Sequence, residues 1–160
     1  MLDTVLVTVH AVAATIAFAA GVLSASSGRL LGVYRVAMAT MAVALVPAVL
    51  VDWATTDPTA RIVFSGLIGL AAAMVLRSEL AARQSPARTG GPTPGYLGHV
   101  GFTLIALADG FAVVTAIRSG MPGWAVGVLA VGVVAVGHLS LSLAKRRLVH
   151  PPAAATMVRA

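Results

Sequence analysis

Five long apolar stretches dominate this chain and leave few folds open to it. An α-helix needs about 20 mostly apolar residues to cross a bilayer core. The candidate stretches run roughly over residues 4–25, 32–51, 61–76, 96–117 and 123–144. Hydrophobic residues make up 59% of the 160 residues and charged residues only 10%, whereas about 25% of a soluble domain is charged. The sequence therefore predicts an all-α integral membrane bundle of five transmembrane helices.

The five stretches predict one transmembrane domain over residues 1–147. The first stretch is too long, and too poor in preceding basic residues, for a cleavable signal peptide, so we expect a retained helix. The third stretch is the shortest, which leaves open whether it spans the bilayer fully. Residues 148–160 contain Pro151, Pro152 and an alanine run and are too short to fold alone. They predict a flexible cytoplasmic tail.

Basic residues are distributed unevenly between the two ends of the predicted helices. With the N-terminus outside, two of the 11 basic residues, Arg61 and Arg118, lie outside. The other nine lie inside and are Arg29, Arg35, Arg77, Arg83, Arg88, Lys145, Arg146, Arg147 and Arg159. Cytoplasmic loops carry an excess of lysine and arginine, so the C-terminus is predicted to be cytoplasmic.

The net charge of +6 has a membrane explanation. The basic residues face anionic lipid headgroups, and no basic patch interleaved with aromatic residues indicates nucleic acid. Lys145 is the only lysine, and a chain rich in arginine, alanine, glycine and valine is typical of a GC-rich bacterial genome. We therefore expect a multi-pass protein of the bacterial plasma membrane. The absence of cysteine excludes disulfides and thiolate ligands.

Residues 10–21 and 99–110 align at an offset of 89 residues, with five identical pairs among twelve. The first and fourth helices run in opposite directions across the membrane. The alignment therefore predicts an inverted repeat that relates helices 1 and 2 to helices 4 and 5. Coincidence of composition is the other interpretation, since alanine and glycine are abundant here. Small residues on the helix faces also predict homo- or hetero-oligomers.

His10 and Asp109 interrupt two of the apolar stretches at similar depths. With a rise of 1.5 Å per residue, they lie about 6 Å and about 4 Å to the outer side of their helix midpoints. An ionisable group in hydrocarbon is costly unless it finds a partner. We expect His10 and Asp109 to contact each other, directly or through a water, and to bind a proton or cation. The alternative is a static structural pair.

His99 and His138 share a depth on the inner side, about 10 Å and about 7 Å from their helix midpoints. Two neutral imidazoles from neighbouring helices, beside small residues, are what a membrane-bound haem b needs as axial ligands. The pair therefore predicts a haem site. Two alternatives stay open: both residues form interhelical hydrogen bonds, or His99 reaches the inner headgroups.

Two further expectations concern the helix ends. Tyr34 and Tyr96 fall at the predicted inner boundary, as interfacial aromatic residues do, and Trp53 and Trp124 fall at the outer one. Glu79 precedes Arg83 by four residues, which predicts an exposed ion pair within one helix.

Three features together resemble a broad group of small, uncharacterised bacterial multi-pass proteins. They are His10 in the first helix, Gly32-Val33-Tyr34-Arg35 at the start of the second, and Gly98-His99-Val100-Gly101-Phe102 at the start of the fourth. That group has no established activity. The histidine pattern is also similar to the b561-type cytochromes, which bind two haems through two histidine pairs. His10 lacks a histidine partner at its depth, so the resemblance implies one haem at most.

These patterns predict a polar intramembrane site built from His10, Asp109, His99 and His138 that serves haem-linked electron transfer. One alternative is a small proton-coupled transporter or exporter in which Asp109 and His10 carry the proton. Another is a non-catalytic subunit of a membrane complex. No phosphate-binding loop, nucleophile elbow or zinc-protease motif is present in the sequence, so soluble-type hydrolysis is not expected.

Reporter fusions test the predicted orientation. Fusions at the C-terminus and within residues 84–94 should both report a cytoplasmic location, because nine basic residues flank the inner helix ends and two flank the outer ones. A fusion at either position that reports the exterior contradicts the orientation.

Overall fold

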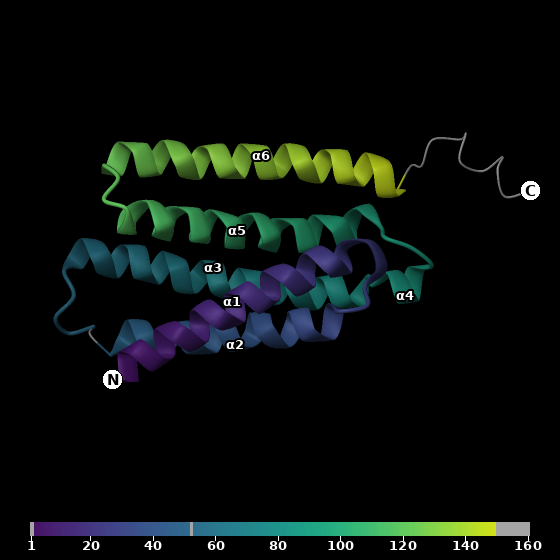
Figure 1. The fold of residues 1–160 in the computed structure, drawn as a ribbon. Helices are drawn as coiled ribbons and strands as arrows, with labels where there is room; N and C mark the ends of the chain where they lie inside the picture. Colours follow the sequence, from purple (N-terminus) through teal and green to yellow (C-terminus); the bar gives the residue numbers. More distant parts are fainter. Residues whose placement is uncertain (1, 52, 150–160) are drawn as a thin grey trace, which may run out of the picture.

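Six helices, five of them long and apolar enough to cross a membrane, make up the described part of the chain (Figure 1). The computed structural model describes residues 2–51 and 53–149. The helices are α1 (Leu2–Ser27), α2 (Leu31–Leu50), α3 (Pro58–Arg83), α4 (Pro86–Thr89), α5 (Pro94–Arg118) and α6 (Gly123–Val149). These described residues contain no strand. The prediction of an all-α chain with five candidate membrane spans is confirmed.

The third helix differs most from its predicted bounds. α3 has 26 residues, as many as α1, and at 1.5 Å per residue this length reaches about 39 Å. The apolar pattern stops before Arg77, but the following arginine, glutamate, leucine and alanine residues are good helix formers and continue the helix. A helix of this length is sufficient to cross a bilayer core.

Two boundaries, one in the segment between α3 and α5 and one at the end of α6, also differ from expectation. The segment 84–94, expected as a loop, contains the short helix α4, which begins with Pro86 and ends at Thr89, followed by Gly90 in the left-handed conformation (φ +75°). Proline at the first position and glycine after the last are the usual ends of a helix. α6 includes Leu148 and Val149, which the sequence predicts to lie in the tail. The rest of that tail, residues 150–160, lies outside the described residues.

The long helices form two packed pairs with α3 between them. α1 packs along α2, α5 packs along α6, and α3 contacts both α2 and α5. Figure 1 shows α5 and α6 side by side, with α1 crossing α2 obliquely. The end of α1, the start of α2, helix α4, the start of α5 and the end of α6 all lie at one end of the bundle, which we call the α4 end (Figure 1).

The core lies among α1, α2, α3 and α5. Small residues of α1, such as Ala13, Ala17 and Ala20, belong to one buried cluster with Met38 and Met41 of α2. Small side chains let helix backbones approach closely where no hydrophobic effect drives association. None of the described residues of α6 is fully buried. This helix is therefore attached to the bundle by one side only.

Glycines on both helices make the α5–α6 contact possible. A Cβ atom at Gly137 would lie 2.6 Å from Cγ1 of Ile105, whereas a Cβ atom at Gly132 on the same helix would meet nothing within 4 Å. Isoleucine is β-branched and has few rotamers with which to move away. The α5–α6 packing therefore depends on the missing side chain at position 137.

We expect Gly137→Val to lower the free energy of unfolding in detergent by about 1–3 kcal/mol, the usual cost of overpacking. Gly132→Val is the matched control, because it makes the same change in the same helix at an open position. Thermal unfolding of both purified variants measures the difference. Equal stability of the two variants contradicts the proposed packing.

Candidate functional site

Four fully buried hydroxyl-bearing residues connect α1, α2 and α5 near the α4 end; they are Ser24, Tyr34, Tyr96 and Thr103. The Thr103 hydroxyl donates to the Val100 carbonyl (2.8 Å), so the Tyr34 hydroxyl donates to Thr103 Oγ1 (2.5 Å). The Tyr96 hydroxyl donates to the carbonyl of Ser24 (2.7 Å). Buried polar groups are costly unless they are hydrogen-bonded. These bonds therefore fix the register of three helices.

Tyr34 and Tyr96 lie in the first turns of α2 and α5, but both side chains are fully buried in the bundle, so neither faces the headgroups as an interfacial aromatic residue would. Gly21 of α1 leaves room for one of them: a Cβ atom at position 21 would lie 3.2 Å from the Tyr34 ring. The sequence does not show whether a tyrosine near a helix end faces the headgroups or packs against a glycine of a neighbouring helix.

Glu79 pairs with Arg35 of α2 and not with Arg83, which corrects the predicted pair within one helix. Arg35 Nε donates to Glu79 Oε1 over 2.9 Å, and Arg35 Nη2 donates to the second carboxylate oxygen. A guanidinium group that binds a carboxylate through two parallel bonds is favoured over a single contact along the helix surface. The pair links α2 to α3.

His10 is bonded to the neighbouring helix α2. Its Nδ1 lies 3.0 Å from the carbonyl oxygen of Met41, and since a carbonyl can only accept, Nδ1–H is the donor. The imidazole is half-buried. His10 therefore joins the α1–α2 pair.

Asp109 does not bond to His10 among the described residues. Its side chain is half-buried, and its Oδ1 atom is buried with no hydrogen-bond partner. α1 meets α5 through later residues, as in the edge-on contact of the Phe18 and Phe111 rings (centroids 6.3 Å apart). Equal depth is not sufficient for contact, because α1 crosses the bundle obliquely and its first half lies along α2.

The structure does not bring His99 and His138 together within one chain. His99 is half-buried on α5, and its buried Nδ1 atom has no hydrogen-bond partner. The guanidinium group of Arg77 on α3 lies near enough to interact electrostatically with the imidazole. His138 is exposed on α6, while its neighbour Gly137 packs against Ile105 of α5. The described residues also contain no group of three or more His, Cys, Asp or Glu side chains that could hold a metal ion.

One face of α5 brings together residues that the sequence does not predict to form a common site. Gly98, Phe102 and Asp109 are four and seven residues apart, a spacing that places them on one side of a helix. The Arg77 guanidinium carbon lies 4.8 Å from the centroid of the Phe102 ring. Lys145 Nζ lies 3.4 Å from where a Cβ atom at Gly98 would be. The helical spacing of the α5 residues is visible in the sequence, but the helices that supply the two cations are not.

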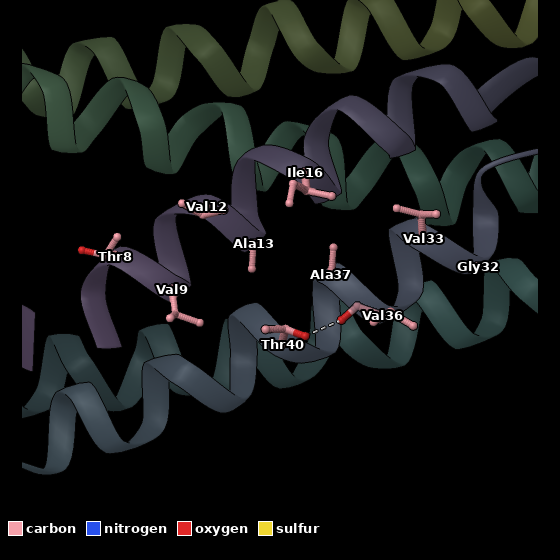
Figure 2. A pocket seen from close by; sticks show the side chains of 10 residues that line it. All are labelled: Thr8, Val9, Val12, Ala13, Ile16, Gly32, Val33, Val36, Ala37 and Thr40. Carbon is pink, nitrogen blue, oxygen red and sulfur yellow. Dashed lines mark hydrogen bonds between the residues drawn. The ribbon is translucent and has the colours of Figure 1, made fainter. Parts of the chain in front are cut away.

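A separate groove of about 650 Å³ lies between α1 and α2 (Figure 2). It is lined mostly by valine, alanine and isoleucine side chains. The two threonine hydroxyls in its wall bond to their own helices: Thr8 donates to the Thr4 carbonyl and Thr40 donates to the Val36 carbonyl. The side chains that line the groove thus offer apolar surface and no free polar group. Such a surface can accommodate a lipid chain but supplies no group for a chemical reaction.

The chain matches no protein-family model, no curated protein and no solved structure. The arrangement of its own residues therefore carries the functional argument.

Proposed function

We propose that this chain is a small proton-coupled transporter or exporter of the bacterial plasma membrane in which Asp109 binds and releases the proton. The observation that carries the proposal is the Asp109 side chain, which lies within the span Pro94–Arg118 and has a buried oxygen without a hydrogen-bond partner. Ionisable residues within membrane helices are costly and are usually functional.

The contrast between the two acidic residues of the long helices α3 and α5 supports this role. Glu79 is neutralised by Arg35, whereas Asp109 forms no ion pair among the described residues. An unpaired carboxyl group in hydrocarbon avoids carrying a lone charge by binding a proton or a cation. It can release that ion when a conformational change exposes it to water. Asp109 is therefore the residue on which coupling would depend.

The proposal includes the orientation with the N-terminus outside and the inverted repeat. Two packed pairs, α1–α2 and α5–α6, each join consecutive spans, as the two halves of such a repeat would. Transporters with inverted repeats bind their ions near the bilayer midplane, where the repeats meet. The offset of 89 residues aligns Asp109 with Ala20, so one half alone would supply the carboxyl group.

Asp109→Asn should abolish proton exchange by the protein. In lipid bilayers, infrared difference spectra recorded between two pH values should show a carboxylic acid band in the wild type that is missing in Asp109→Asn. Asp57→Asn, which changes an acid in the α2–α3 loop, should keep that band. Vesicles with an imposed pH gradient should then lose the gradient on addition of a transported solute from a panel of cationic, neutral and anionic compounds.

Asp109→Glu should retain part of this coupling, because it preserves the carboxyl group. Unchanged infrared spectra and unchanged gradient loss in Asp109→Asn would refute the role of Asp109.

A second candidate function, haem-linked electron transfer, is favoured by the exposure of His138. An imidazole in the second half of a helix that buries no residue is unusual for a membrane span. In a two-fold dimer packed through α6, the two His138 side chains would lie at the same depth. A two-fold interface uses the same surface on both copies, so a residue close to the axis lies opposite the same residue of the other copy. Two neutral imidazoles at one depth are suitable axial ligands for haem b.

Absorbance spectra test this second function and the ligand set. Protein expressed with haem available should show a Soret band and a sharp α band on reduction, both lost in His138→Ala. If the haem lies between two copies, His99→Ala keeps the bands. If His99 and His138 ligate it as the sequence predicts, His99→Ala loses them too. A colourless protein after haem reconstitution excludes electron transfer through haem, and loss of both candidate functions favours a non-catalytic subunit.

A further inference from the structure

We propose that the phosphate group of an anionic phospholipid binds on α5 at the α4 end of the bundle, held by Arg77 of α3 and Lys145 of α6. The proposed site comprises Arg77, Gly98, His99, Phe102 and Lys145, and we call it the headgroup site. It is independent of the proposed transport function.

Two cations from different helices converge on one turn of α5. The Arg77 guanidinium lies over the Phe102 ring, with its central carbon 4.8 Å from the ring centroid. Lys145 Nζ lies 3.4 Å from the position of a Cβ atom at Gly98. Residues four apart on a helix have side-chain origins about 5–6 Å apart. The two charges therefore border the same small area of the α5 surface.

Neither cation has an acidic partner in the part of the chain that the structure describes. The ion pair in the described residues joins Arg35 to Glu79. Glu79 lies two residues from Arg77 and therefore on another side of α3. Asp109 lies seven residues beyond Phe102, about 10 Å further along α5. Two cations that border one area of α5 without an acidic partner would both be stabilised by an anion placed between them.

His99 adds an unused polar group beside the same area. Its Nδ1 atom is buried and has no hydrogen-bond partner. His99 follows Gly98 directly and precedes Phe102 by three residues, so it belongs to the same turn of α5. Buried polar atoms without partners are rare and call for a ligand or a water. His99 therefore adds an unsatisfied polar group on the Arg77 side of the headgroup site.

The position of the headgroup site indicates a lipid as the source of the anion. His99 lies about 10 Å from its helix midpoint, while half of the hydrocarbon thickness is about 15 Å, so the site is just below the headgroup level. Val131 and Val134 of α6 are exposed apolar residues that lie 14 and 11 residues before Lys145, on the same side of the helix as that lysine. Basic sites between membrane helices on the cytoplasmic side bind anionic lipids. The Phe102 ring fixes the guanidinium in place.

Binding can be measured on the full-length protein in detergent, with phosphatidylglycerol, phosphatidylcholine and inorganic phosphate as separate probes. Phosphatidylglycerol should raise the unfolding temperature and remain bound in native mass spectra. Arg77→Gln and Lys145→Gln should each weaken its binding about fivefold, which corresponds to about 1 kcal/mol per basic residue. Arg83→Gln and Arg146→Gln are matched controls, because both residues are exposed at the same end, and they should change affinity by less than twofold.

Equal weakening by the control variants would overturn the proposal, since it would indicate diffuse attraction and no site. Equal stabilisation by phosphatidylcholine or by inorganic phosphate would overturn the assignment to an anionic lipid. Photocrosslinking of the wild type with a photoactivatable phosphatidylglycerol does not depend on variants that fold. Crosslinks should map to peptides containing Arg77, residues 98–102 or Lys145, and crosslinks confined to other segments would reject the headgroup site.

Discussion

The hydrogen bonds of Tyr34 and Tyr96 are the contacts on which the rest of the bundle depends. Lipid tails are as apolar as leucine, so burial of apolar surface gives these helices little reason to associate. Buried hydroxyl groups, in contrast, have no alternative partner in hydrocarbon. Tyr34 bonds to Thr103 and Tyr96 bonds to Ser24, and together they join α2 to α5 and α5 to α1. The alanine and glycine surfaces of these helices then pack at the register that the tyrosines impose.

The polar groups of the bundle fall into two classes with different consequences. The tyrosine hydroxyls, the Arg35–Glu79 pair and the His10 side chain are all satisfied by partners on other helices, and they serve assembly. His99 Nδ1, Asp109 Oδ1 and Ser24 Oγ are buried without partners among the described residues. Two of these three belong to α5, which contacts α1, α3 and α6. α5 is therefore the helix with the most unsatisfied buried polar atoms among the described residues.

The sequence was sufficient to predict the all-α class and the five candidate spans, because length and hydropathy determine both. It was not sufficient to predict which polar residues meet. His10 and Asp109 have similar depths, yet the oblique path of α1 places His10 against Met41. Glu79 has a suitable arginine four residues away, but the guanidinium group of Arg35 reaches it with two bonds. Depth and helical spacing describe one helix at a time, whereas contacts depend on crossing angles that a single sequence does not contain.

The attachment of α6 has a mechanical consequence. The side-chain hydrogen bond within the described part of α6 runs from the Ser142 hydroxyl to the His138 carbonyl of the same helix. The contact between α6 and α5 relies on the missing side chains at Gly101 and Gly137, which leave room for Leu141 and Ile105. Sliding or tilting of this helix would break no hydrogen bond to another helix in the described bundle. The other four long helices are cross-linked by polar bonds and would stay together. The molecule therefore consists of four long helices that are cross-linked by polar bonds and a fifth, α6, that is held by apolar packing against α5.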